Sequence, residues 1–234
     1  IPQLARLIRE LGTFDTVSIG STGLTAEETD PRGLRDLVGA GQVLMAHDSV
    51  TSYLGALGDQ RGAVVAVGTG VVTLAVGATS VARVDGWGNL IGDAGSGYWV
   101  GRAALDAVMR AHDGRGPATA LTDVVQADFP DLEQAYIELQ GDPGRVRRIA
   151  SYTRAVAELA ASDDVAARIC RDAAAELAHS VITALERVSE DTAPVVCGIG
   201  GVLRAPAIAD PFAAALRERW ERVDIRDPLG SGID

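Results

Sequence analysis

The 234-residue chain contains no lysine, because all 21 of its basic residues are arginine. A Walker A lysine and a Schiff-base lysine are both excluded, since each needs an ε-amine. Cysteine is almost as rare, and Cys170 and Cys197 stand too far apart for a zinc knuckle or a disulfide framework. The only asparagine, Asn89, precedes Leu90 and Ile91, which excludes an N-glycosylation sequon. With no disulfide framework indicated, a reducing cytoplasm is the default expectation.

An excess of positive charge is also missing. Acidic residues outnumber basic ones by 32 to 21, so the formal net charge is −11 and a nucleic-acid partner is not expected. Apolar residues make up 47% of the chain, yet every apolar run ends well short of the roughly 20 residues that a membrane span needs. The sequence therefore predicts a soluble protein with no membrane partner, of one or two domains.

The first 58 residues alternate helical and strand patterns. The opening stretch, IPQLARLIRELG, predicts an amphipathic helix rather than a signal peptide, and because Ile1 is not a methionine we expect a fragment. A strand at Asp15–Gly20, a helix at Leu34–Val38 and an apolar run at Val43–Asp48 follow. This alternation favours a parallel sheet buried on both faces, with Asp48 at the carboxyl end of a strand, where sites in such sheets lie.

Residues 61–100 differ in composition, with four charged residues but nine of the chain's 27 glycines. The β-branched runs at 62–68 and 71–77, with a shorter one at 81–84, predict an antiparallel meander. Helical periodicity returns at 96–112.

The rest of the chain is mostly helical. Residues 121–190 are alanine-rich, and we expect breaks in the helical pattern at Pro130 and Pro143. A buried strand beginning at Pro194 and a helix at 206–220 complete the predicted elements.

Two glycine clusters could hold a nucleotide. Gly68-Thr69-Gly70 joins two predicted strands, and its amides and hydroxyl could approach an anion closely, although an ordinary hairpin turn has the same pattern. The run Gly198-Ile199-Gly200-Gly201 follows a strand and precedes a helix, where bare backbone could face a nucleotide. Close packing of strand on helix is the alternative explanation.

A third cluster, Gly86–Gly97, contains five glycines and is expected to be an ordered loop. It carries Trp87 and Asp93, and sugars are bound by such a pair, since a carboxylate accepts hydroxyl hydrogen bonds while an aromatic ring covers apolar C–H groups. As alternatives, Trp87 could be a core anchor and Asp93 an Asx turn or a helix N-cap.

Asp48 also has two interpretations. It could cap a helix that begins at Ser49. It could equally be the general base that orients a hydroxyl attacking the γ-phosphoryl group of ATP. His47, His112 and His179 show no metal-ligand spacing and are expected to pack or to lie on the surface.

The motifs in combination resemble a known family. The order AHD, AVGTGVVTLAV, DGWGNLIGDAGSGYWVGRAALDAVMRAHDGRGP and VVCGIGGVLRAP is similar to the N-acetylglucosamine kinases, members of the BadF/BadG/BcrA/BcrD ATPase family. The resemblance implies an α/β, ribonuclease H-like (actin-like ATPase) fold of two domains with an interdomain active-site cleft. Residues 1–58 would be the remainder of an incomplete N-terminal domain, and 59–234 a C-terminal domain with a helical insertion at about 101–190.

The same resemblance implies roles for individual residues. Asp48 would be the catalytic carboxylate and would contact the hydroxyl that is phosphorylated. The further sugar contacts would be Gly86, Trp87, Gly88 and Asp93. The ATP-binding residues would be Gly68, Thr69, Gly70, Ala150, Gly200 and Gly201. ATP with Mg²⁺ would be the cofactor, with no metal ligand assigned in this chain, and the protein would be a cytoplasmic homodimer.

The chain departs from the family pattern at His47, Val71 and Ala94, where asparagine, serine and glutamate are usual, and no DGGGT-like first phosphate loop precedes Ile1. Two alternatives therefore stay open. One is an ATPase that activates a 2-hydroxyacyl-CoA dehydratase or benzoyl-CoA reductase, and the other is a non-catalytic sugar-binding relative. The sequence leaves open whether the sugar is N-acetylglucosamine, glucosamine, N-acetylmannosamine or a muramic acid derivative.

Overall fold

The structure, a computed structural model, describes residues 2–22, 31–189 and 192–230. Ile1, from which a missing start was inferred, and residues 231–234 lie outside this range. The chain divides into two compact units, Ile1–Asp59 with Leu229–Asp234, and Gln60–Pro228. The predicted division fell after residue 58, and its assignment to two ATPase domains around a cleft stays a prediction.

The first unit follows the predicted alternation of helix and strand. Its elements are α1 (Pro2–Leu11), β1 (Thr16–Ser21), α2 (Arg32–Val38), β2 (Gln42–His47) and α3 (Asp48–Leu57). The two strands pair in parallel, as the sequence predicts.

The prediction that both faces of this sheet are buried is wrong for the described strands. Val17 and Ile19 of β1 alternate with more exposed residues and pack with Val43 of β2 on the core formed by α1 and α2. Leu44 points the other way and is 50% exposed. The period of two in side-chain direction therefore gives this sheet one well-buried face.

The second unit is built on a mixed five-stranded sheet. Strands β3 (Gly62–Val67), β4 (Val71–Val76) and β5 (Val81–Val84) form the predicted antiparallel meander, and β6 (Val195–Ile199) with β7 (Asp224–Arg226) extends it in parallel. The strand order is β5-β4-β3-β6-β7. Strand β7 was not predicted, because its three residues are too few to show a period.

Helices supply the rest of the second unit. They are α4 (Gly97–His112), α5 (Leu121–Asp128), η1 (Leu132–Gln134), α6 (Ala135–Gly141), α7 (Arg145–Ser151), α8 (Thr153–Leu159), α9 (Asp164–Arg187), η2 (Val202–Arg204) and α10 (Pro206–Arg219). Breaks at Pro130 and Pro143 are confirmed. Two further breaks, at Tyr152 and before Asp163, were missed because no proline marks them; Asp163 caps α9 by accepting the Ala166 amide at 2.8 Å.

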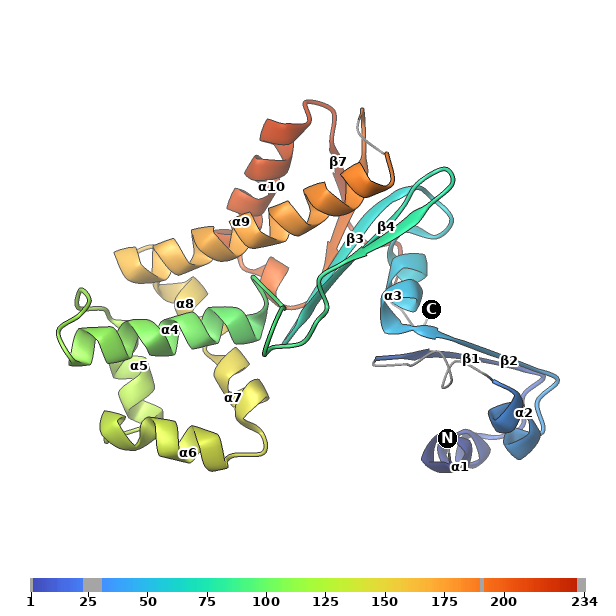
Figure 1. Ribbon diagram of the computed structural model, residues 1–234, viewed down its shortest axis with the longest axis horizontal. Coiled ribbons are helices and arrows are strands. Elements are labelled where there is room, and N and C mark those ends of the chain that lie inside the picture. The colour runs from blue at the N-terminus through green and yellow to red at the C-terminus, as the bar shows by residue number, and fades with distance from the viewer. Residues whose placement is uncertain (1, 23–30, 190–191, 231–234) are drawn as a thin grey trace. The chain divides into compact units, whose positions relative to one another are not determined.

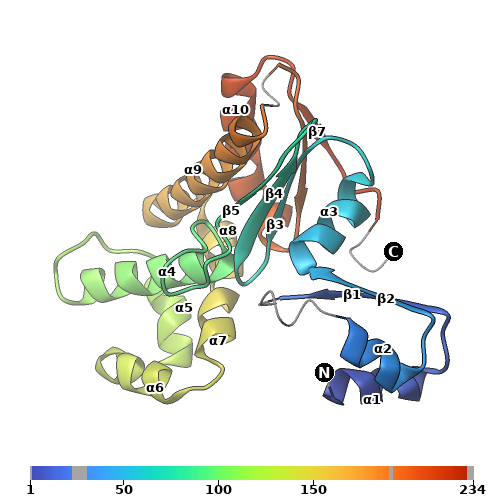
Figure 2. The same cartoon turned by 45° about the vertical axis from the view of Figure 1, so that its right-hand side comes forward.

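The core of the second unit lies between the sheet and its long helices. Helix α9 contacts β3, β4 and β5 on one side and packs along α10 (Figures 1 and 2). Helices α4 to α8 group together beside the end of the sheet where β3 turns into β4 (Figures 1 and 2). Among the described residues, no helix combines the length and apolar composition that crossing a membrane requires.

Candidate functional site

The turn between β3 and β4 is held on the N-terminus of α4. Val67 pairs with Val71, so Gly68, Thr69 and Gly70 form the whole connection. The Gly97 amide donates to the Gly68 carbonyl at 2.9 Å, and the Tyr98 amide donates to the Thr69 carbonyl at 3.0 Å. The first amides of α4 therefore fix the shape of this turn.

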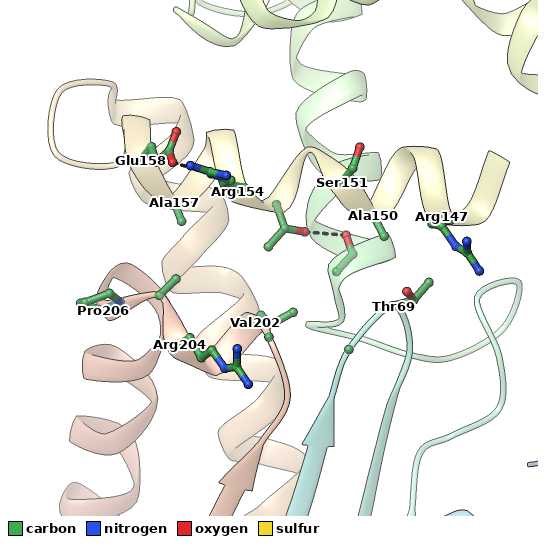
Figure 3. Close-up of a pocket in the computed structure, with 15 residues that line it drawn as sticks. Thr69, Arg147, Ala150, Ser151, Arg154, Ala157, Glu158, Val202, Arg204 and Pro206 are labelled. Carbon is green, nitrogen blue, oxygen red and sulfur yellow. Dashed lines mark hydrogen bonds and ion pairs between the residues drawn. The ribbon is translucent and has the colours of Figure 1, made fainter. Parts of the chain in front are cut away.

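A cavity of about 800 Å³ opens beside the turn. Four stretches of sequence surround it: the turn, the start of α4, the pair α7 and α8, and the stretch that follows β6 (Figure 3). Its lining residues are Gly68, Thr69, Gly97, Arg147, Ala150, Ser151, Thr153, Arg154, Ala157, Glu158, Gly201, Val202, Arg204, Ala205 and Pro206. The two glycine clusters predicted to contact a nucleotide, the GTG turn and the GIGG run, thus contribute to one cavity.

Close helix packing sets the position of the wall that carries Ala150. Thr153 Oγ1 donates to the Gly97 carbonyl at 2.9 Å, and Ala150 Cβ lies 3.5 Å from where a Cβ on Gly97 would be. A Cβ on Gly101 of α4 would overlap the carbonyl oxygen of Ile149 in α7. Glycine at 97 and 101 therefore lets α7 lie directly against α4.

The GIGG run divides into two roles. Gly200 has φ +104°, and a Cβ there would overlap the carbonyl oxygen of Val67, so this glycine packs the end of β6 against β3. Gly201 has nothing within 4 Å of an added Cβ and lines the cavity. Close packing thus explains Gly200, and a ligand could approach the backbone at Gly201.

The GTG turn divides in the same way. Gly68 has open space at its Cβ position and lines the cavity, whereas a Cβ on Gly70 would lie 2.6 Å from Asp93 Oδ2. Gly70 and Gly200 are therefore absent from the lining, while Gly68, Thr69, Ala150 and Gly201 share it.

The cavity is positively charged although the chain is acidic. Three arginines, Arg147, Arg154 and Arg204, line it against a single acid, Glu158. Arg154 Nε lies 2.8 Å from Glu158 Oε1, so these two charges compensate each other (Figure 3). Two arginine charges are left to attract an anion. No sequence pattern pointed to these residues, because they lie on exposed helical positions.

The loop expected to bind sugar is organised by Asp85, which sequence reasoning missed. Its Oδ1 accepts the amides of Gly86 at 2.7 Å and Asp93 at 2.8 Å, and its Oδ2 accepts the Ala94 amide at 3.0 Å. Asp85 itself has φ +60°. An aspartate directly before a glycine-rich run was the available signal, since Asx side chains often bond the backbone that follows them.

Trp87 is not a core anchor, because it is 63% exposed. The Arg83 guanidinium lies 5.2 Å from the centre of its ring. Gly86 and Gly88, on either side, have φ +78° and +84°, which glycine adopts without a Cβ clash. The indole is therefore presented at the surface of a conformationally fixed loop.

Asp93 is 7% exposed and does not cap α4, since Ser96 accepts the Trp99 amide in that position. Burial raises the pKa of the Asp93 carboxyl, and hydrogen bonds from the main chain of Val71 and Gly88 oppose that rise. The carboxylate thus joins the GTG turn to the loop that carries Trp87. Asp93 therefore does not form an Asx turn.

Asp48 belongs to the first unit and is described there alone. It follows β2 as the first residue of α3, it is exposed, and its Oδ1 accepts the Ser49 amide at 2.8 Å. The predicted position at a strand end is confirmed, and the N-cap alternative is wrong because His47 occupies the cap position.

The described residues include neither a readily ionised thiol nor a cluster of metal ligands. Burial raises the pKa of the Cys170 and Cys197 thiols to about 11 each. No three His, Cys, Asp or Glu side chains of the described residues gather closely enough to hold a metal ion.

Residues 5–233 match the model of the BadF/BadG/BcrA/BcrD ATPase family. An N-acetylmuramic acid/N-acetylglucosamine kinase from Clostridium acetobutylicum is 30% identical over 236 residues, covering 95% of this chain and 76% of the relative. An N-acetyl-D-glucosamine kinase from Dictyostelium discoideum is 28% identical, covering 91% and 71%. A solved structure from Chromobacterium violaceum, assigned as an N-acetylglucosamine kinase, superposes with a TM-score of 0.70 at 27% identity, covering 92% and 72%.

Proposed function

Because this chain belongs to the BadF/BadG/BcrA/BcrD ATPase family, we propose that it is an ATP-dependent kinase of N-acetylglucosamine or a related amino sugar, acting on the 6-hydroxyl. Its fold is the predicted actin-like ATPase fold, and the Chromobacterium violaceum structure superposes on it with a TM-score of 0.70. The observation that carries the proposal is the single cavity that brings Gly68, Thr69, Ala150 and Gly201 together. These residues come from three separate stretches of sequence, and family resemblance gives all of them to ATP.

We assign the two ends of ATP to two chemically different parts of this cavity. Ala157, Val202 and Pro206 offer an apolar wall that suits the flat adenine ring. The phosphates would lie at Thr69, whose hydroxyl and flanking glycines allow a close approach. Mg²⁺ would enter as the counter-ion of the ATP phosphates, since this cation is commonly held by substrate phosphates together with water.

We assign the sugar to the loop that carries Gly86, Trp87, Gly88 and Asp93. The exposed Trp87 ring can cover the apolar C–H face of a pyranose. Asp93 lies against Gly70, so a sugar bound at this loop would be close to the phosphate-binding turn. This adjacency is what transfer of a phosphoryl group to a sugar hydroxyl requires.

In the proposed reaction, the oxygen of the sugar 6-hydroxyl bonds to the γ-phosphorus of ATP while Asp48 accepts the proton of that hydroxyl. The bond from the γ-phosphorus to the β–γ bridging oxygen breaks, and ADP leaves. A carboxylate suits this task because it orients the hydroxyl and takes its proton. The side chain of Asp48 is exposed and already accepts one amide hydrogen bond, which fixes its direction.

The names of the relatives support an amino sugar, since one is named for both N-acetylmuramic acid and N-acetylglucosamine and another for N-acetyl-D-glucosamine. An activating ATPase with an iron–sulfur cluster needs cysteines placed at a subunit surface. Cys170 and Cys197 are both buried, so we favour the kinase. From resemblance alone, we also propose that the protein acts in the cytoplasm as a homodimer.

The test is ADP release by the purified protein with Mg-ATP and a panel of sugars, with a no-sugar control. The panel contains N-acetylglucosamine, N-acetylmuramic acid, N-acetylmannosamine, glucosamine and glucose. We expect ADP release only with N-acetylated amino sugars, and the phosphorylated product identified by mass spectrometry and NMR at the 6-position. ADP release without any sugar would instead support the activating ATPase, and sugar binding without ADP release would support a non-catalytic relative.

A further inference from the structure

Arg147 is an exposed arginine on the cavity wall, and no described residue supplies it with a counter-charge. Its neighbour Arg148 points elsewhere, with acidic partners at Glu138 and Asp142 and its guanidinium 4.2 Å from the centre of the Phe129 ring. Arg154 of the same wall is paired with Glu158, 2.8 Å away. Within the described part of the chain, Arg147 makes no ion pair or hydrogen bond, so its charge is available to a ligand.

Helix geometry places Arg147 at the end of the cavity that holds the GTG turn. Residues three apart on a helix share a face, so Arg147 lies on the same face of α7 as Ala150. Ala150 packs at Gly97, whose amide bonds the Gly68 carbonyl. Figure 3 agrees, since it shows Arg147 on the same side of the cavity as Thr69, and Arg204 and Pro206 on the other side.

The N-terminus of α4 does not offer its first amides to an anion at this turn. The amides of Gly97 and Tyr98, which begin α4, are already engaged by the carbonyls of the turn. The chain contains no lysine. A side-chain cation of this chain that stays charged throughout the neutral pH range is therefore an arginine, and a guanidinium can bond two oxygens of a phosphate at once.

We propose that Arg147 binds the β- and γ-phosphates of the nucleotide and makes affinity depend on the number of phosphate groups. This inference rests on the proposed function, because it assumes that the cavity takes an adenine nucleotide. Arg147 would then be a binding residue that raises the affinity for ATP and ADP over AMP and adenosine.

Isothermal titration calorimetry tests the proposal, with adenosine, AMP, ADP and ATP titrated into the wild-type protein and two variants at constant salt and Mg²⁺. In Arg147→Gln, we expect ADP and ATP to bind about tenfold more weakly, while adenosine binds within about twofold of wild type. Arg147→Lys should recover part of the loss, because it keeps the charge without the planar fork.

Arg145→Gln is the matched control. Arg145 lies on the same helix and is exposed, but it does not line the cavity. Removing its charge should change ADP affinity by less than about twofold at physiological salt, because exposed distant charges are screened.

The outcomes separate the two levels of inference. If Arg147→Gln lowers the affinities for adenosine and ADP equally, Arg147 supports the cavity wall and does not bind the phosphates. If the affinity for ADP is unchanged, Arg147 does not take part in binding. Either result overturns the proposal. A wild-type protein that binds no adenine compound would overturn the proposed function as well.

Discussion

Gly101→Ala is the substitution for which sequence and structure predict opposite results. Gly101 lies inside α4, where alanine is normally favoured over glycine by roughly 1 kcal/mol. In the folded protein, however, the added Cβ would overlap the Ile149 carbonyl oxygen and lie 2.7 Å from its carbonyl carbon. Carbon atoms pack at roughly 3.5–4.0 Å and the oxygen lies nearer still, so α7 would have to move away from α4 by more than about 1 Å.

The expected cost follows from this displacement. Forcing an extra carbon into a packed interface destabilises by about 1–3 kcal/mol, which exceeds the gain in helix propensity. We therefore expect Gly101→Ala to lower the free energy of unfolding by about 1–2 kcal/mol. Since Arg147 and Ala150 flank Ile149 on α7 and line the cavity, the KM for ATP should rise several-fold while the KM for the sugar changes little.

Urea unfolding followed by circular dichroism measures the first effect, and ADP-release kinetics measure the second. Gly141→Ala is the control, because Gly141 ends α6 with nothing within 4 Å of an added Cβ. It should leave both KM values unchanged and stability equal or slightly higher. If Gly101→Ala is as stable as wild type and keeps its KM for ATP, the close packing of α4 and α7 does not shape the cavity.

Three further substitutions test other parts of the molecule. Asp48→Asn should leave ATP affinity nearly intact while turnover falls at least about a hundredfold; unchanged ADP release would exclude Asp48 as the base. Asp85→Asn turns an amide donor toward main-chain amides, so urea unfolding should show a loss of about 1–3 kcal/mol, with a higher KM for the sugar; unchanged stability would mean that the loop holds its shape without this carboxylate. Asp163→Ala should cost about 1 kcal/mol at pH 7 through the lost cap on α9. Burial disfavours the Asp163 charge, but hydrogen bonds from the Ala166 and Ala120 amides outweigh it and lower its pKa below 3.8. Because the folded pKa is the lower one, the stabilisation is present above pH 3.8 and lost as the pH falls through the folded value; a wild-type to mutant difference that is as large at pH 3 as at pH 7 would contradict this.

Local pattern was enough to predict most elements. The β-branched runs on either side of Gly68-Thr69-Gly70 predicted β3 and β4, and the apolar run at Val43–Asp48 predicted β2 with Asp48 directly after it. These predictions succeeded because β-branched residues favour extended backbone and glycine favours turns, which are properties of single residues and their neighbours along the chain. The motif order also identified the family that the matched model shows.

Which residues meet across the fold was decided by tertiary structure. Asp85 fixes the shape of the Trp87 loop because its carboxylate accepts the amides of Asp93 and Ala94, eight and nine residues further along the chain. The sequence alone does not show that these amides lie at Asp85. The sequence carries no sign that Arg147 lines the same cavity as Thr69, because 77 intervening residues separate them and helical periodicity says only that Arg147 is exposed. Local sequence thus determined the elements and the motifs, while the packing of α7 on α4 determined the cavity and its charge, since contacts between distant residues depend on the whole fold.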